Sequence, residues 1–459
     1  GERGTITVSE RTHHPDVTNV PTDTPTTTDA ATTTGTPPPS GAGPGDTAPD
    51  APDAPAPPSG RLARGVRLLA MIGPAFVVGS WQFGPGALTA AVQAGSGYGY
   101  ALIWVVVLCN LLMLAFADMS IRVGIMSGTS LIATIKQYCG ALVAKLSGVG
   151  LFVITLMFSV GNAVGSGLGL SLLFGGSVIW WSLACTALVA CVLLARRLYR
   201  AIEKALLAVV ATMALSFVVT AFLSGPEWSA AGEGFIPSLP AGAGLLIVAM
   251  VGTNFSMNAA FFASYASRER GLKREQYRQT TIVDTIPGIV APGIMTVLVL
   301  ITAATVLGGN GEEASFGDLA GVLEPVAGEA GRIIFALGFF GAAFSSMLAN
   351  ATAGSTVLAD AFGWAREVSA LPVRLGILGI LVFGAAVTVI AGSSPVQLII
   401  IAQALTVLVK PLLGVVLLVL ANNRTLMGPL GNAWWQNVCG AAGVLLVVGT
   451  SIHLALNLY

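Results

Sequence analysis

The chain has 459 residues, of which 54% are hydrophobic and only 10% are charged. This composition excludes a soluble globular protein of this length and predicts a multi-pass membrane protein. Lysine plus arginine and aspartate plus glutamate both total 22, a balance that gives no indication of a nucleic-acid partner.

Residues 1–60 are rich in Thr, Pro, Ala, Gly and Asp. No hydrophobic cluster in this segment could offset the entropy lost on ordering it, so it is predicted to be a disordered cytoplasmic tail. The segment also lacks the apolar core of a signal peptide. Residues 61–459 are predicted to form one transmembrane transporter domain.

Apolar segments follow one another through this domain, and most of them approach the roughly 20 residues that cross a bilayer core. The sequence predicts eleven transmembrane helices in an all-α integral membrane fold. Repeat one covers about 67–224, repeat two about 241–421, and an extra helix about 436–457. The approximate limits of the eleven are 67–93, 100–120, 147–174, 178–195, 204–224, 241–266, 285–308, 333–360, 373–391, 395–421 and 436–457.

The charges of the predicted loops are asymmetric. With the tail in the cytoplasm, twenty of the 22 Lys and Arg residues fall in the tail or in inner segments, and only Arg332 falls in an outer loop. The remaining cation, Lys410, lies inside a span. The acids of the outer loops include Glu227, Glu233, Glu312, Glu313, Asp318, Glu324 and Glu329. This pattern obeys the positive-inside rule and predicts a cell-membrane protein with a cytoplasmic N-terminus and an external C-terminus.

Two spans contain interruptions at matching places. The first carries Gly84-Pro85-Gly86 at its centre, and the sixth, which runs the opposite way, carries polar residues within MVGTNFSMNAAFFASY. A proline kink that only shapes packing could explain one interruption, but the pair is typical of an inverted-repeat secondary transporter. Backbone groups freed at this depth are tolerated where they line a cavity or a substrate site. The residues that interrupt the apolar sixth span are Gly252, Thr253, Asn254, Ser256 and Asn258.

Several segments resemble the natural resistance-associated macrophage protein (NRAMP) family of divalent-metal transporters, which shares the LeuT-like amino-acid-transporter fold. The resemblance covers roughly residues 66–430 and depends on the order and spacing of the segments. It implies an inverted five-plus-five repeat with one extra helix. The matching segments are GPAFVVGSWQFGPGALTAAVQAG, MSGTSL, AVGSGLGLSLLFG, RRLYRAIEKAL, ALGFFGAAFSSMLANATAGSTVLADAFG and IIIAQALTVLVKPLLGVVLLVLANNRTLMG.

The departures from the family fall on its metal site. The Asp-Pro-Gly-Asn motif of the family aligns with Gly84-Pro85-Gly86-Ala87, and its Met-Pro-His run falls near Phe255 and Met257. The family's acidic residues in helix three are replaced in the region of Asn162, whereas Gln403 keeps a position that the family uses at the metal. The resemblance implies a substrate site of Gly84, Pro85, Gly86, Ala87, Asn254, Phe255, Ser256, Met257, Asn258 and Gln403. Its candidate metal ligands are Gly84, Asn258 and Gln403.

Lys410 is an unusual residue inside the tenth span. A lysine at the membrane centre costs about 2.5–3.5 kcal/mol on insertion scales, which makes it a functional candidate. Facing the cavity, it would repel a metal and act as a counter-charge for an anionic or zwitterionic ligand. The competing interpretation is that its side chain snorkels to the cytoplasmic face.

Other polar residues within the spans could line a transport pathway. Such side chains also hold membrane helices together through hydrogen bonds, so both interpretations stay open. The pathway candidates are Asn162, Ser345, Ser346 and Asn350.

Two substrate classes therefore compete. The family resemblance implies a divalent metal ion, whereas the absence of a midplane carboxylate favours a small organic zwitterion or anion, because divalent cations prefer anionic oxygen ligands. The N–H groups after Pro85 would suit a carboxylate. A non-transporting sensor on the same fold is a third interpretation. No enzyme activity and no cofactor are expected, and the partners expected are the lipid bilayer and the small transported substrate.

Overall fold

A computed structural model describes residues 82–194, 196–308, 314–364, 369–391 and 394–457. All of them belong to a single unit, Ser59–Tyr459. The predicted tail 1–60, the basic residues that follow it and the first half of helix one lie outside the described residues. The predictions for those segments therefore stay predictions.

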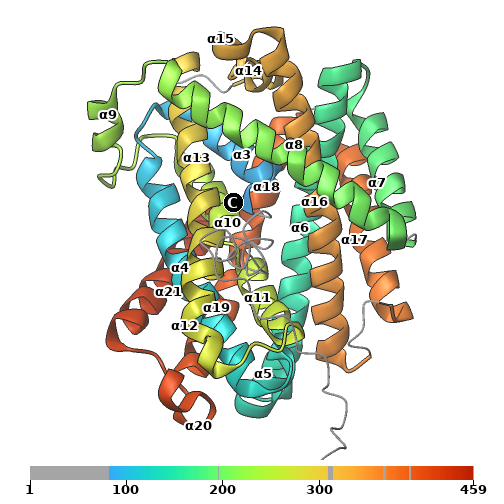
Figure 1. Cartoon of the computed structure of the whole chain (residues 1–459), viewed down its shortest axis with the longest axis vertical. Helices are drawn as coiled ribbons and strands as arrows, with labels where there is room; N and C mark the ends of the chain where they lie inside the picture. The colour runs from blue at the N-terminus through green and yellow to red at the C-terminus, as the bar shows by residue number, and fades with distance from the viewer. Residues whose placement is uncertain (1–81, 195, 309–313, 365–368, 392–393, 458–459) are drawn as a thin grey trace, which may run out of the picture. The chain divides into compact units, whose positions relative to one another are not determined.

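Every regular element of the described residues is a helix, which confirms the all-α class (Figure 1). The part that corresponds to the first repeat contains α3 (Pro85–Tyr98), α4 (Ile103–Ser127), α5 (Leu131–Cys139), α6 (Ala141–Phe174), α7 (Val178–Leu194) and α8 (Arg196–Leu223). The short α9 (Trp228–Glu233) follows.

The second part begins with α10 (Gly244–Asn254) and α11 (Met257–Glu269), then η1 (Arg274–Gln276), α12 (Tyr277–Thr280), η2 (Thr281–Thr285) and α13 (Ile286–Leu307). It continues with α14 (Phe316–Gly321), α15 (Glu324–Ala327), α16 (Glu329–Phe362) and α17 (Leu371–Ala391). The last elements are α18 (Pro395–Leu405), η3 (Thr406–Leu408), α19 (Lys410–Asn422), α20 (Arg424–Met427), η4 (Gly428–Leu430) and α21 (Trp434–Asn457).

Long apolar helices account for most of the chain, because a bilayer requires every backbone group to be paired within the segment. Seven described helices are long and apolar enough to cross a membrane, and the pair α18–η3 and α19, bent by 44°, would be an eighth. Two more apolar helices, 178–193 and 208–223, are shorter. The lengths agree with a multi-pass protein, while the number eleven stays a prediction.

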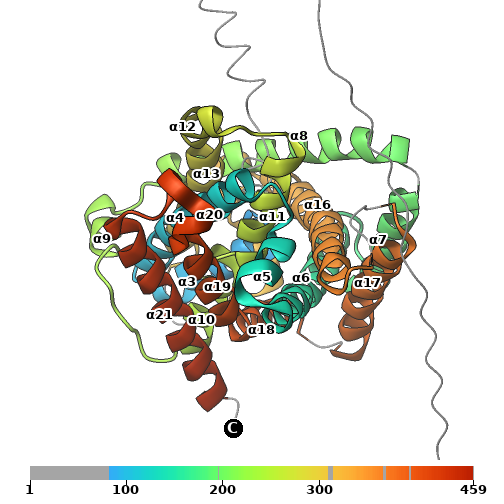
Figure 2. The ribbon, with the colours of Figure 1, turned by 90° about the horizontal axis from the view of Figure 1, so that it is seen from below.

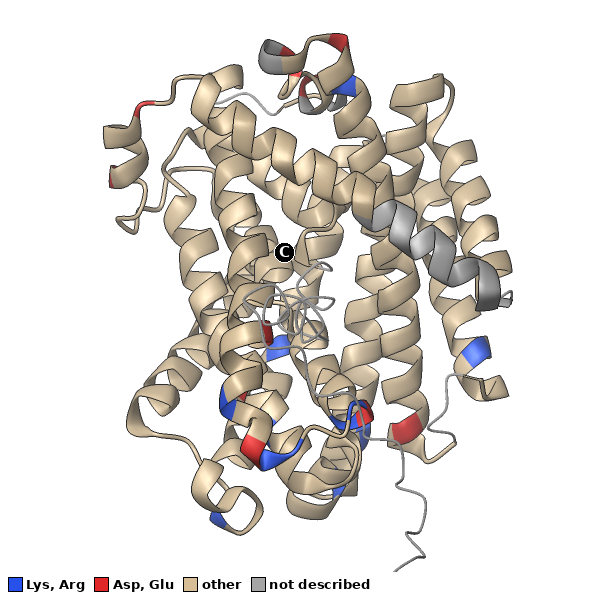
Figure 3. Ribbon diagram, in the orientation of Figure 1, with Lys and Arg blue, Asp and Glu red and all other residues tan. Residues whose placement is uncertain are grey.

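The charged residues of the described part gather at the two ends of the helices. Lys and Arg lie mainly at the lower end of Figure 3, together with some acids, whereas the upper end is mainly acidic. The stretch between the ends carries few charges. This asymmetry between the two ends is of the kind from which the positive-inside rule predicts orientation.

Two long helices, α6 and α16, form the most extensive helix pair of the structure and lie side by side in both views (Figures 1 and 2). The two helices approach closely at Gly354 of α16. A Cβ added there would lie 2.7 Å from Cγ2 and 2.8 Å from Cβ of Thr155 on α6. Small residues at such crossings allow membrane helices to pack by close van der Waals contact.

We expect Gly354→Ala to lower the free energy of unfolding by about 1–3 kcal/mol, because overpacking displaces the neighbouring atoms. The β-branched side chain of Thr155 has few rotamers with which to withdraw. Gly379→Ala on α17 is the matched control, since nothing lies within 4 Å of its added Cβ. That control should be neutral or stabilising by up to about 1 kcal/mol. Thermal unfolding in detergent measures both variants, and equal melting temperatures would contradict this packing.

A buried ionic cluster ties α4 to the C-terminal helices. The Arg122 Nε donates to Asp118 Oδ2 over 2.9 Å, and its other guanidinium nitrogens donate to Leu430 O and to Asn432 Oδ1. The Asp118 carboxylate also accepts a hydrogen bond of 2.6 Å from the Tyr277 hydroxyl. Arg122 is only 2% exposed, so this cluster holds a full charge within the protein interior.

Candidate functional site

The interruption predicted in helix one lies at the start of α3. Gly84 precedes this helix in an extended conformation, with φ −89° and ψ −179°, and Pro85 occupies the first helical turn. Proline is tolerated there because the first N–H groups of a helix have no intrahelical acceptor. No side chain caps this end. Gly86 and Ala87 follow in the same buried turn.

The interruption predicted in helix six separates α10 from α11. Between them, Phe255 has φ −97° and ψ 75° and Ser256 has φ −88° and ψ 89°, both outside the helical region. The carbonyl groups at the end of α10 are thereby released from the helical hydrogen-bond pattern. Both residues are buried. The structure therefore shows the interruption of helix six, while for helix one it shows that a helix begins at Pro85 and the preceding half of the span lies outside the described residues.

Gln403 on α18 lies where helices one, three and six meet. A Cβ added to Gly86 would lie 2.5 Å from Cδ of Gln403, and one added to Gly161 would lie 2.8 Å from its Nε2. A Cβ at Gly252, on α10, would lie 2.8 Å from the Gln403 carbonyl carbon. Three glycines thus provide the space that the Gln403 residue fills, and both interruptions border it.

Buried polar atoms without a hydrogen-bond partner are found on Gln403 and on residues that neighbour these glycines or the Gly84 interruption in sequence. In the described part of the chain, they include Gln403 Oε1, Asn162 Nδ2 and both amide atoms of Gln82. All three side chains are buried. A native protein rarely leaves such groups unpaired without a functional reason. Amide oxygens in this setting can bind a cation or a water carried with it.

Two residues of this region were missing from the prediction. Gln82 precedes the Gly-Pro-Gly interruption by two positions, and a polar residue inside an apolar span was the signal that could have identified it. Thr406 lies one helical turn after Gln403 and donates to Gly252 O and Gln403 O. Nothing in the sequence pairs Thr406 with a carbonyl that lies 154 residues away.

The predicted residues of helices six and eight form a separate hydrogen-bonded chain. The Ser256 hydroxyl donates 2.6 Å to Asn258 Oδ1, and Asn258 Nδ2 donates to Asn350 Oδ1. Asn350 Nδ2 in turn donates to the Ser346 carbonyl. Ser345 is half-buried and bonds within its own helix. The predicted ligand Asn258 therefore already has partners on both of its amide atoms.

Three other predicted residues make local or hydrophobic contacts. The Asn254 amide donates to Met250 O, one turn back in α10. The Phe255 ring packs edge-on against Phe116 with 5.1 Å between ring centroids. Met257 Cε lies 3.1 Å from a Cβ added to Gly414 of α19. The structure does not bring these three side chains to Gln403.

Lys410 neither snorkels nor faces an open cavity. Its side chain is fully buried. The Nζ donates to the carbonyl oxygens of Val251, Gly252 and Phe255 at the end of α10. The interpretation that it snorkels to the cytoplasmic face is wrong, because the polar atoms of the helix-six interruption bind it inside the protein. Its three donors are committed to backbone acceptors, which does not favour a role as counter-charge to a ligand.

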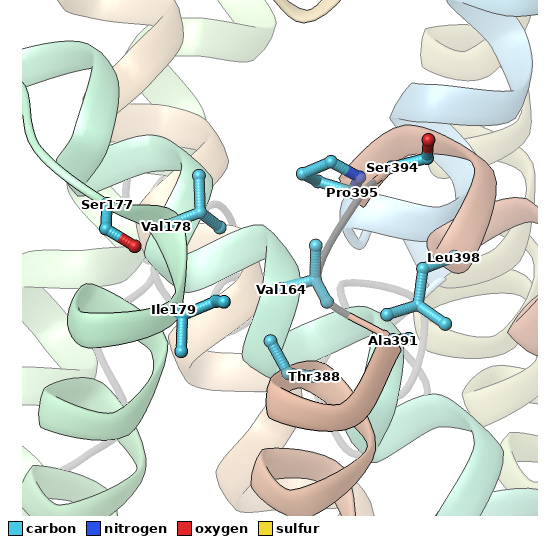
Figure 4. A pocket seen from close by; sticks show the side chains of 9 residues that line it. All are labelled: Val164, Ser177, Val178, Ile179, Thr388, Ala391, Ser394, Pro395 and Leu398. Atoms are coloured by element: carbon cyan, nitrogen blue, oxygen red, sulfur yellow. The ribbon is translucent and has the colours of Figure 1, made fainter.

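A cavity of about 160 Å³ lies between α6, α7, α17 and α18 (Figure 4). Its lining is largely aliphatic and includes none of the predicted site residues. Leu398, on its wall, precedes Gln403 by five positions on α18. The lining residues are Val164, Ser177, Val178, Ile179, Thr388, Ala391, Ser394, Pro395 and Leu398.

The chemistry available around Gln403 is that of neutral oxygens. Among the described residues, no three His, Cys, Asp or Glu side chains gather in a way that could hold a metal ion. What the helix interruptions offer are main-chain carbonyls, N–H groups and the amides of Gln82 and Gln403. Such a set can replace part of the hydration shell of a cation, with weaker attraction than carboxylates provide.

Comparisons with known proteins agree with this architecture. The model of a family described as natural resistance-associated macrophage protein-like matches residues 75–457. The divalent metal cation transporter MntH of Pectobacterium carotovorum subsp. carotovorum is 27% identical over 404 residues, which cover 86% of this chain and 96% of that protein. The MntH of Klebsiella pneumoniae is 28% identical over 397 residues, with coverages of 85% and 94%.

The fold is also found among solved structures. A mutant of the Eremococcus coleocola manganese transporter superposes with a TM-score of 0.71 at 20% identity, and the match covers 86% of this chain and 87% of that one. This likeness confirms the predicted inverted-repeat transporter fold. The alternative of an organic substrate finds no support in the relatives named above.

Proposed function

This chain belongs to the natural resistance-associated macrophage protein-like family, and from this premise we propose that it transports a divalent metal ion across the cell membrane. The relatives named as divalent metal cation transporters support the substrate class. Transport would proceed by alternating access, in which the two repeats, about 67–224 and 241–421, rock about a site between them.

The observation that carries this proposal is the position of Gln403. Its buried Oε1 has no hydrogen-bond partner among the described residues, and its side chain lies against Gly86 at the first interruption. Its main chain lies against Gly252, close to the second interruption. A cation bound to this oxygen would lie beside the first broken helix, while the main chain of the same residue packs against the second, so its binding could depend on how the two repeats are arranged.

The ligands of the ion would be neutral. Gln403 Oε1, the Gln82 amide oxygen and a main-chain carbonyl near Gly84 are the available donors, with water completing the coordination. Asn258 would take part only after exchanging its hydrogen bonds to Ser256 and Asn350. Divalent cations retain several waters where the protein offers few charged ligands. We therefore expect low affinity compared with a site that contains a carboxylate.

The orientation in the membrane follows from charge. We place the N-terminus in the cytoplasm and the C-terminus outside, since basic residues of the predicted loops are concentrated on one side. In this arrangement the first and sixth spans run in opposite directions, as the inverted repeat requires.

Substitution of Gln403 tests the proposal. Gln403→Leu should weaken saturable Mn²⁺ binding about tenfold or more, because it removes the buried oxygen without adding volume to the site. Gln397→Leu is the matched control, since Gln397 lies on the same helix with an exposed side chain, and it should leave binding unchanged. Calorimetric titration of the purified protein, followed by Mn²⁺ uptake into proteoliposomes, measures both.

Three results would contradict the proposal. Equal Mn²⁺ binding by the two variants would remove Gln403 from the site. If the folded wild-type protein gave no heat of Mn²⁺ binding but did give heat on titration with an amino acid or a carboxylate, a metal ion would not be its substrate. Binding without uptake would favour the sensor interpretation.

A further inference from the structure

The Lys410 ammonium lies at a structural junction. Lys410 is the first residue of α19 and follows η3 after one intervening residue, at the point where the tenth span bends by 44°. Its Nζ reaches the interruption of the sixth span, where it lies 2.8 Å from Phe255 O and 3.4 Å from Val251 O and also donates to Gly252 O. We call these three main-chain oxygens the carbonyl site. The bend of one helix is thus joined to the break of another.

The number of acceptors indicates the charged form of the amine. An ammonium group has three N–H donors and a neutral amine has two, and the carbonyl site provides three acceptors in reach. Neither of the salt bridges found between described residues involves Lys410. The positive charge is therefore balanced chiefly by carbonyl dipoles at the C-terminal end of α10.

Such an end is a natural cation site. The last carbonyls of a helix carry a partial negative charge, and in transporters with interrupted helices these groups coordinate inorganic cations such as Na⁺. Here a side chain of the protein supplies the cation. The three carbonyl oxygens surround the Lys410 ammonium as they would a bound inorganic cation, but this cation is covalently attached to α19.

We propose that the carbonyl site is a monovalent-cation site permanently occupied by the Lys410 ammonium, which replaces an exchangeable ion. The carbonyl site lies next to the Gln403 main chain through Gly252 but does not use the Gln403 side chain, so this proposal does not depend on what that side chain binds. A tethered cation cannot dissociate, so the wild-type protein holds α10 and α19 together regardless of the monovalent ions in solution. Removal of the side chain then opens a site for a small free cation.

Chemical rescue tests this proposal directly. Lys410→Ala removes Cγ, Cδ, Cε and Nζ, the atoms of n-propylammonium. We expect a lower melting temperature than in wild type, and saturable recovery by about 5 °C or more with n-propylammonium or Na⁺. The neutral isostere 1-propanol should not restore stability. Lys136→Ala, at an exposed lysine of α5, is the control and should respond to neither compound.

Two further measurements do not depend on the alanine variant folding. Lys410→Met keeps most of the side-chain volume without the charge, so it should melt below wild type and gain nothing from added cations. The wild-type protein should show the same melting temperature in NaCl, KCl and choline chloride at equal ionic strength. Melting of the methionine variant at or above wild type would overturn the proposal.

Other results would also overturn it. Saturable stabilisation of the wild type by Na⁺ would show that the carbonyl site exchanges ions. Equal rescue of Lys410→Ala by 1-propanol would show that only volume is needed. Because the readout is thermal stability without divalent metal, failure here would leave the proposed transport function standing, and failure of metal binding would leave this proposal standing.

Discussion

The double variant Gly84→Asp/Ala87→Asn is expected to bind Mn²⁺ about 10- to 100-fold more tightly than the wild-type protein. It restores the Asp-Pro-Gly-Asn motif of the family at the interruption of helix one. The carboxylate supplies an anionic oxygen, and the number of charged ligands is a principal determinant of divalent-cation affinity. A tenfold gain corresponds to about 1.4 kcal/mol.

The backbone can accept the aspartate. Gly84 has φ −89° and ψ −179°, an extended conformation open to any residue, and it precedes a helix, where aspartate is a preferred capping residue. Ala87 is fully buried in the first turn of α3, so the larger asparagine must be accommodated by small shifts. Without metal the buried carboxylate should lower stability, and Mn²⁺ should restore it.

The control for this experiment is Gly84→Asn/Ala87→Asn, which adds nearly the same volume without the charge. Calorimetric titration with Mn²⁺ compares the two variants, and only the aspartate variant should gain affinity. If both fold and neither differs from wild type, the metal does not bind at the Gly84 interruption, and the proposed position of the site is wrong.

Arg122→Met should lower the free energy of unfolding by about 3–5 kcal/mol, because it leaves the Asp118 carboxylate in the interior without its cation. The substitution also removes the donors to Leu430 O and Asn432 Oδ1. The hydrogen bonds from Tyr277 and Gln436 remain on Asp118, but neither residue is charged. Stability should therefore fall by far more than a surface ion pair is worth.

Arg332→Met provides the matched control. Arg332 pairs with Glu329 at 3.6 Å, and the two side chains are 44% and 74% exposed. An exposed pair of this kind contributes about 0–1 kcal/mol. Thermal unfolding in detergent at one salt concentration measures both variants. A loss for Arg122→Met no larger than that for Arg332→Met would show that the cluster around Asp118 does not stabilise the fold.

The fold was predictable because its determinants are local. Hydropathy locates the spans. The tripeptide Gly84-Pro85-Gly86 disfavours a continuous helix, because proline lacks an N–H and glycine is flexible. The helix-six interruption follows from a short run of polar residues around Asn254. The number of spans stays a prediction, since α7 and the apolar part of α8 are short and half of helix one is not described.

The site was predictable only in part. Gln403 was identified through the resemblance, and the structure places it between the two interruptions. Asn258 was also predicted as a metal ligand, but its side-chain amide donates a hydrogen bond to Asn350 instead. Gln82 was overlooked although it lies within the interrupted span itself. These three amides differ in whether a side chain from a distant helix forms a hydrogen bond with them. The spacing of residues in the sequence does not show this.

The sequence by itself determined that this is a multi-pass membrane protein of interrupted helices, because chain composition and backbone propensity act over a few neighbouring residues. Only the tertiary structure decided what Lys410 does. From its position in a span, two interpretations were open: a counter-charge that faces the substrate, or a side chain that snorkels to the aqueous surface. The buried Nζ instead binds carbonyls more than 150 positions earlier, because the break after α10 presents main-chain oxygens that a donor from a neighbouring helix can reach.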